Sequence, residues 1–152
     1  MYDKKKFKRV FFIPETDYAQ AKKNVSKLQD KFRLSGGMQV LYADTEEALE
    51  TVIALSRPYA DIFKDATKRE ALNSFGQTPK LFQSLSAISD EIQNVVLVAS
   101  PDILNDILGS SKRRGYNLAT LSDKKGQVRV YNGDWESLNK YKKPYDQLTF
   151  TL

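Results

Sequence analysis

The sequence predicts an α/β fold: one three-layer, Rossmann-like domain over residues 1–152, with a mostly parallel central sheet, helices on both faces and a small antiparallel addition at the C-terminal end. The valine-rich run Asn94–Ala99 is the first reason, because it is typical of a strand buried on both faces, which needs helical cover on each side. The corner Ser100–Asp102 is the second, since Ser100 suits a helix cap and Pro101 a first helical turn.

The first strand–helix unit begins with the strand Phe7–Ile13, which is apolar in its second half and is ended by Pro14. A helix follows to about Phe32, because apolar side chains recur every three or four residues on one face. Thr16 or Asp17 is expected to cap it by accepting a hydrogen bond from a backbone N–H of the first turn.

The second unit is the strand Met38–Ala43 followed by a helix for which Asp44 or Thr45 is the expected cap. Arg57-Pro58 bends or ends this helix, because proline cannot donate a backbone hydrogen bond. The apolar spacing of Tyr59–Lys68 then predicts a further helical piece.

Another helix is expected before the central strand. Asn73–Thr78 reads as a loop, and Pro79 suits the start of the helix. Its expected inner face consists of Leu81, Leu85, Ile88 and Ile92. Helices beyond the one that a βαβ unit needs form a lid, a partner surface or simple packing, and we favour packing.

After the central strand, a short helix is predicted for Asp102–Leu108. Asn117–Leu121 and Gln127–Tyr131 are strand candidates joined as a hairpin, and Asn132-Gly133 is a turn signal. Asp134–Lys143 has the spacing of a short helix but stays ambiguous.

Composition limits the chemistry. The sequence has neither cysteine nor histidine, so Ser-His-Asp catalysis, Cys-His catalysis and zinc sites of the usual kind are excluded. General acid–base work would fall to Asp, Glu, Lys or Tyr. We expect no cofactor and no metal, because neither a phosphate-cradling glycine loop nor a dinucleotide motif is present. The lack of cysteine, of a signal peptide and of a membrane span favours the cytoplasm.

Three predicted strand ends would meet at one edge of a parallel sheet: Pro14–Asp17, Asp44–Glu47 and Ser100–Asp102. The ligand-binding candidates there are Thr16, Asp44, Ser100 and Asp102. Hydroxyls and helix N-termini could hold an anion, and the carboxylates a magnesium ion or a ribose hydroxyl. The alternative, which we favour, is that these side chains only cap helices.

The 24 Lys and Arg residues outnumber the 19 acidic residues and concentrate toward both ends of the chain. Basic side chains interleaved with aromatic rings are typical of single-stranded nucleic-acid binding, although such rings are also core residues. The candidate contacts are Lys4, Lys5, Lys6, Lys8, Lys112, Arg113, Arg114, Lys124, Lys125, Lys140, Lys142 and Lys143.

The last six residues alternate polar and apolar side chains: Gln147, Leu148, Thr149, Phe150, Thr151 and Leu152. This hexapeptide resembles the short peptides by which bacterial replication and repair proteins dock on the sliding clamp. The resemblance implies that Gln147 hydrogen-bonds at a pocket rim and that Leu148, Phe150 and Leu152 are apolar anchors. The alternative is the last strand of the sheet.

These observations favour a non-catalytic cytoplasmic accessory module that contacts nucleic acid or an acidic protein through its basic N- and C-terminal regions. The alternative is a nucleotide- or phosphate-ligand-binding enzyme that uses the three strand-end corners. A third reading is a structural or regulatory subunit whose partner covers the segment Tyr59–Ile92.

Overall fold

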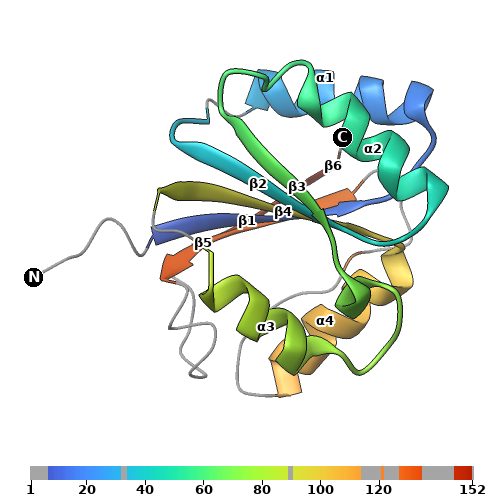
Figure 1. The fold of residues 1–152 in the computed structure, drawn as a ribbon, viewed down its shortest axis with the longest axis vertical. Coiled ribbons are helices and arrows are strands. Elements are labelled where there is room, and N and C mark those ends of the chain that lie inside the picture. The colour runs from blue at the N-terminus through green and yellow to red at the C-terminus, as the bar shows by residue number, and fades with distance from the viewer. Residues whose placement is uncertain are drawn as a thin grey trace, which may run out of the picture.

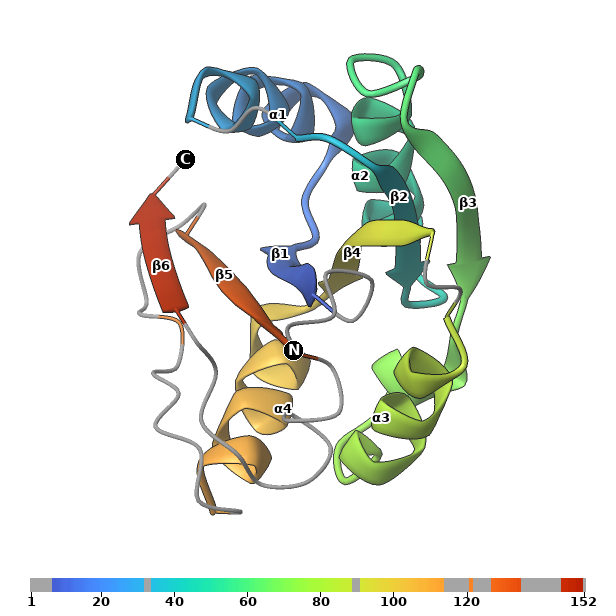
Figure 2. The same ribbon diagram turned by 90° about the vertical axis from the view of Figure 1, so that its left-hand side faces the viewer.

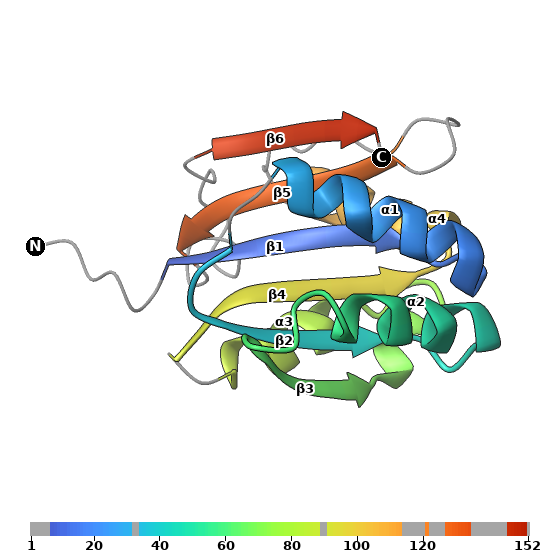
Figure 3. The same ribbon diagram turned by 90° about the horizontal axis from the view of Figure 1, so that it is seen from above.

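The computed structural model describes residues 7–31, 34–88, 91–113, 121, 127–134 and 146–151. Its strands form one sheet of six, in the order β3-β2-β4-β1-β5-β6. The strands are β1 (Phe7–Pro14), β2 (Gly37–Tyr42), β3 (Phe63–Lys68), β4 (Ile92–Ala99), β5 (Gln127–Asp134) and β6 (Asp146–Thr151). The first four are parallel, whereas β5 is antiparallel to both of its neighbours (Figure 3). The predicted α/β fold with a small antiparallel C-terminal addition is confirmed.

Helices cover both faces of this sheet, as the prediction requires. The helices are α1 (Tyr18–Lys31), α2 (Glu46–Ser56), α3 (Thr78–Ser86) and α4 (Pro101–Arg113), with a 3-10 turn, η2 (Glu70–Leu72). Figures 1 and 2 show α1 and α2 on one face, and α3 and α4 on the other. None of the helices in the described ranges is both long and apolar enough to span a membrane.

The central strand β4 is buried from Val95 to Ala99, with no exposed surface at any of these residues. Val95–Ala99 can be wholly apolar because α1 and α2 cover one face of the strand while α3 and α4 cover the other. The buried cluster includes Leu28 and Leu55 from the first layer and Leu81 and Leu104 from the second. The valine-rich run therefore lies where the sequence places it.

Predicted capping residues begin three helices. The Asp17 Oδ1 accepts a hydrogen bond from the backbone N–H of Gln20 (2.9 Å), and this cap lies just before α1. The Thr45 hydroxyl accepts from the N–H of Ala48 (3.1 Å), so Thr45 rather than Asp44 caps α2. At α4, the Ser100 hydroxyl accepts from the N–H of Ile103 (3.3 Å), as its place before Pro101 predicts.

The helical piece predicted for Tyr59–Lys68 is wrong. Residues 57–62 form turns, and Phe63–Lys68 is the edge strand β3. The apolar spacing that suggested a helix is misleading here, because β3 takes its conformation from backbone pairing with β2. Of its residues, Phe63, Ala66 and Thr67 are half-buried and the others are exposed.

The region before β4 differs from the prediction at its end. Leu81, Leu85 and Ile88 are buried as expected, but α3 stops at Ser86 and Ile92 is already the first residue of β4. Its side chain reaches the core from the sheet, not from a helix. After β4, helix α4 continues five residues beyond the predicted end at Leu108, as far as Arg113.

The C-terminal addition is built differently from the predicted hairpin. The strand predicted at Gln127–Tyr131 is confirmed, but β5 continues through Asn132-Gly133, which is paired with β1 and is not a turn. Its two neighbours are β1 and β6, so Asn117–Leu121 is not its partner. Residues 117–120 and 135–145, including most of the ambiguous segment Asp134–Lys143, lie outside the described residues.

The alternative reading of the C-terminal hexapeptide is confirmed, because β6 is an edge strand paired with β5. Gln147, Leu148 and Phe150 lie in this strand, and Leu152 lies outside the described residues. Docking of the four residues on a partner stays a prediction.

Candidate functional site

The carboxyl ends of the parallel strands meet at one edge of the sheet, and backbone hydrogen bonds join the corners that follow them. The N–H of Glu15 donates to the carbonyl oxygen of Ala99 (2.8 Å), which connects the corners after β1 and β4. The N–H of Ala43, after β2, donates to Val98 of β4 (2.9 Å). The predicted convergence of the three corners is therefore present. We call residues 15–17, 44–47, 68–69 and 100–102 the strand-end edge.

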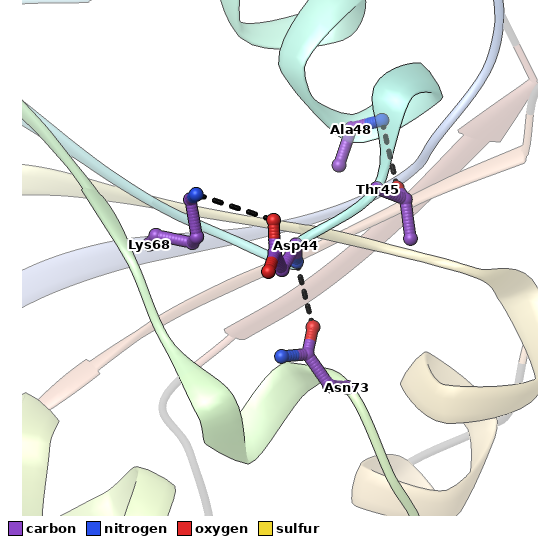
Figure 4. Close-up of polar contacts among 5 residues, drawn as sticks. All are labelled: Asp44, Thr45, Ala48, Lys68 and Asn73. Atoms are coloured by element: carbon purple, nitrogen blue, oxygen red, sulfur yellow. Dashed lines mark hydrogen bonds and ion pairs between the residues drawn. The ribbon is translucent and has the colours of Figure 1, made fainter.

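Asp44 is held at two points of this edge (Figure 4). Its backbone N–H donates to the side-chain oxygen of Asn73, at 2.6 Å, and its carboxylate forms an ion pair with the ammonium group of Lys68, at 3.2 Å. More than half of each charged side chain is exposed, so the ion pair itself stabilises the fold little. Its effect is to fix Asp44 beside the end of β3.

Thr45 joins the corner after β2 to the corner after β1. Its hydroxyl oxygen accepts from the N–H of Ala48, the capping bond drawn in Figure 4, while its hydroxyl proton is donated to the Glu15 carboxylate. One side chain therefore serves both as a helix cap and as a positioning group for a carboxylate. Among the described residues, Thr45 is the only hydrogen-bond partner of the Glu15 side chain.

Thr16 is held through its backbone by Thr51, a buried residue of α2. The N–H of Thr16 donates to the Thr51 hydroxyl oxygen (3.0 Å). The same hydroxyl lies 3.0 Å from the carbonyl oxygen of Thr16 and 2.8 Å from that of Glu47, and it can donate to either. The corner after β1 is thus fixed to the body of α2.

The other predicted ligand-binding residues are less integrated. The Ser100 hydroxyl is engaged as the cap of α4, and Asp102 is exposed in the first turn of that helix. Within the described residues no hydrogen bond or ion pair connects Asp102 to Thr16 or Asp44. Ser100 therefore acts as a helix cap, as the alternative predicts. Asp44 and Thr16 instead lie among residues that hydrogen bonds and an ion pair connect.

The edge also contains residues that the sequence reading missed, notably Lys68 and Arg69. The N–H of Arg69 donates to the carbonyl oxygen of Tyr42 (3.0 Å), so Arg69 follows β3 directly beside the end of β2. Its Nε atom is enclosed, and no described residue accepts a hydrogen bond from it. The prediction of a helix at Tyr59–Lys68 did not place these two cations at the strand-end edge, because they lie there only when this segment is a strand. The position of Glu15 after Pro14 places it in a predicted corner, but nothing in the sequence predicts its hydrogen bond with Thr45.

The described residues contain no group of three or more Asp or Glu side chains arranged to hold a metal ion. The edge combines the carboxylates of Glu15 and Asp44 with the cations of Lys68 and Arg69 and with the N-termini of α1, α2 and α4. Backbone N–H groups at a helix N-terminus favour negative charge. The edge thus combines cations and helix N-termini, which attract an anion, with carboxylates.

Solved structures with a similar fold superpose on nearly the whole chain. A phosphoglycerate mutase from Plasmodium falciparum superposes with a TM-score of 0.67 at 14% identity, over 96% of this chain and 90% of that one. The chain has a histidine phosphatase-like fold. A mycobacterial glucosyl-3-phosphoglycerate phosphatase in complex with VO3 gives a TM-score of 0.64 at 11% identity, over 95% and 98% of the two chains.

The protein histidine phosphatase SixA, in complex with tungstate, gives a TM-score of 0.59 at 11% identity, over 93% of this chain and 96% of that chain. At these identities the likeness concerns the fold. No protein-family model matches the sequence, and the search of curated proteins found no match.

This fold corrects the favoured function, a non-catalytic module for nucleic acid or an acidic partner. The similar structures reported above are phosphatases and a phosphoglycerate mutase, and these comparisons do not support nucleic-acid binding. Of the twelve basic candidates, Lys8 lies in β1, and Lys112 and Arg113 lie in the last turn of α4. The other nine lie outside the described residues. Charge composition misled the prediction, because it reports on surface potential and not on fold.

Proposed function

We propose that this protein binds a phosphate ester at the strand-end edge and acts in the manner of a phosphatase or phosphomutase. The observation that carries the proposal is the convergence of the three corners in a histidine phosphatase-like fold. Two proteins of similar fold are complexed with VO3 and tungstate, which are oxyanions like phosphate. Ligands of α/β sheets bind outside the carboxyl ends of the strands, which is where these corners lie. A cytoplasmic location is part of the proposal, on composition alone.

Arg69 is the residue we assign to the phosphate group. Its guanidinium presents several N–H donors in a planar fork that matches two phosphate oxygens. Arg69 follows β3 directly beside the end of β2, and no described residue accepts a hydrogen bond from its enclosed Nε atom. Lys68 is already paired with Asp44 and therefore contributes less.

Turnover at this edge needs a chemistry without histidine, because the sequence contains none. We assign Glu15 as the general base: its carboxylate takes a proton from water while the water oxygen bonds to phosphorus. The ester P–O bond breaks with its electron pair leaving on the alcohol oxygen, to which the protonated Glu15 or solvent returns a proton. Donation from the Thr45 hydroxyl fixes one carboxylate oxygen, Oε2, and leaves the other for the proton.

The binding test uses titration calorimetry with inorganic phosphate and with tungstate on the whole chain. We expect Arg69→Gln to weaken binding about tenfold or more, because a charge-assisted pair is lost. The matched control is Arg57→Gln, an exposed arginine at the opposite end of α2, which should leave the affinity unchanged. Absence of phosphate and tungstate binding at millimolar concentration, or equal effects of both variants, would overturn the proposal.

The catalytic assignment is tested with p-nitrophenyl phosphate as substrate. Glu15→Gln should lower the hydrolysis rate about 100-fold, which is the usual range for loss of a general base. It should also strengthen phosphate binding, because a negative charge beside the anion is removed. The control is Asp61→Asn, an exposed carboxylate in the turn before β3. Hydrolysis that is unaffected by Glu15→Gln would show that Glu15 is not the base.

A further inference from the structure

The loop between η2 and α3, residues 73–77, is attached to the molecule on two sides; we call it the Phe75 loop. Asn73 accepts from the backbone N–H of Asp44 at the strand-end edge, at 2.6 Å (Figure 4). On the other side, the N–H of Gly76 donates to the Asp106 carboxylate of α4, at 2.9 Å. Gly76 has a φ of 77°, a left-handed conformation in which glycine is unstrained. Phe75 is thus fixed between these two attachment points.

Phe75 lies mostly outside the core. It is 61% exposed, more than the other two large apolar side chains that are exposed in the described part of the chain, Leu49 and Ile53. Burying a phenylalanine side chain contributes roughly 1.5–3 kcal/mol, and the fold forgoes much of that gain here. Because Phe75 is two residues from Asn73, its Cα lies within about 7 Å of the Cα of the residue that contacts Asp44 at the strand-end edge.

We propose that Phe75 is an aromatic platform that selects phosphate esters whose organic group is itself a planar aromatic ring. This inference rests on the proposed function, in which Arg69 and the helix N-termini hold the phosphate. An exposed ring at the rim of an anion site can stack on the organic group while the phosphate is held beneath it. A loop attached on both sides keeps the ring in place before the ligand binds, which lowers the entropic cost of stacking.

The experiment compares three probes by titration calorimetry: inorganic phosphate, glycerol 3-phosphate and phenyl phosphate. On the wild-type chain, phenyl phosphate should bind about tenfold more tightly than glycerol 3-phosphate, given the usual effect of one stacked ring. Phe75→Ala should abolish this preference and leave the affinity for inorganic phosphate unchanged. Phe75→Tyr should retain the preference, because the ring remains. The control is Ile53→Ala, which removes an exposed apolar side chain from α2.

The outcomes separate this inference from the proposed function. Equal affinity for phenyl and glycerol phosphates, with no effect of Phe75→Ala, overturns the platform while phosphate binding itself stands. No binding of any of the three probes overturns both. A preference for phenyl phosphate that Phe75→Ala removes supports both. Two further ligands, adenosine monophosphate and O-phosphotyrosine, then identify the source of the ring: the one whose affinity falls more in Phe75→Ala is the better match.

Discussion

Strand β2 has two parallel neighbours, β4 and β3, that have the same backbone geometry in very different surroundings. β4 lies in the middle of the sheet, is covered by helices on both faces and is almost wholly apolar. β3 forms the edge, reads Phe-Lys-Asp-Ala-Thr-Lys and has no fully buried residue. Burial of apolar side chains explains why β4 is a strand, whereas pairing with β2 explains why β3 is one. One sheet therefore contains a strand determined by its own sequence and a strand determined by its neighbour.

The two strands also divide the work. β4 supplies core residues that hold the two helical layers together, while β3 leads into Lys68 and Arg69 at the strand-end edge. Charged side chains on β3 protect an exposed sheet edge from pairing with other chains. The candidate site therefore takes its cations from the end of the edge strand β3. It takes backbone hydrogen-bond acceptors from the end of the central strand β4.

The largest expected effect is at the centre of β4. Leu97 has no exposed surface and lies in register with Phe12 of β1 and Leu41 of β2. Leu97→Ala should lower the free energy of unfolding by about 4 kcal/mol, through lost burial and the cavity left behind. Lys64→Ala, at an exposed position of β3, should change it by less than about 0.5 kcal/mol. Urea unfolding at 25 °C measures both, and equal losses would refute the contrast.

A second effect concerns Tyr59, the buried residue through which the connection to β3 joins the core. Its carbonyl oxygen accepts from the N–H of Phe63, the first residue of β3 (2.8 Å). Burial raises the pKa of Tyr59 to about 12 from 10.0, because the charged phenolate is poorly solvated there. The folded state therefore keeps the proton between pH 10 and 12 after the unfolded state has lost it. Stability should fall across that window by up to roughly 3 kcal/mol.

Tyr59→Phe isolates this contribution, since the phenylalanine ring has nothing to titrate. Below pH 10 the variant should be more stable than the wild type by about 1 kcal/mol, because the buried Tyr59 hydroxyl has no hydrogen-bond partner in the described structure. The difference should widen as pH rises from 10 to 12. Denaturant unfolding of both proteins at pH 9, 10, 11 and 12 is the measurement. A constant difference would mean that Tyr59 titrates normally.

The smallest effect compares two glycines with nearly the same backbone angle. Gly36 (φ 80°) stands against β4, where an added Cβ would lie 2.4 Å from the Cγ of Gln93. Gly76 (φ 77°) lies in the Phe75 loop after β3, and an added Cβ would meet open space. Gly76→Ala should cost about 1 kcal/mol for the left-handed backbone alone. Gly36→Ala should cost about 2 kcal/mol, since Gln93 must also move. Equal losses of stability for the two variants in thermal unfolding would show that the Gln93 side chain moves away at no cost.

Much of the architecture could be predicted because it is encoded locally. The run Val95–Ala99 is apolar in sequence and buried in structure, and Asp17, Thr45 and Ser100 cap helices where their positions predict. Edge pairing could not be predicted, because β3 has no strand-like alternation of polar and apolar residues and its partner β2 lies some 20 residues earlier.

The candidate site could be predicted only in part, for the same reason. Asp44 and Thr16 follow strands that the sequence reveals, so the sequence places both residues at this edge. Lys68 and Arg69 lie at the end of β3, a strand that the sequence pattern does not predict. The bond from Thr45 to Glu15 joins residues from two different strand–helix units, and no local pattern contains it.

The grip of Thr51 on Thr16 has a consequence for the speed of binding. Because the backbone N–H of Thr16 donates to a buried hydroxyl of α2, a shift of the first corner breaks this hydrogen bond unless α2 moves with it. For the phosphate ligand proposed above, we therefore expect no slow rearrangement of this corner before capture. Encounter by diffusion, and not reshaping of the protein, then sets the rate at which that corner is filled.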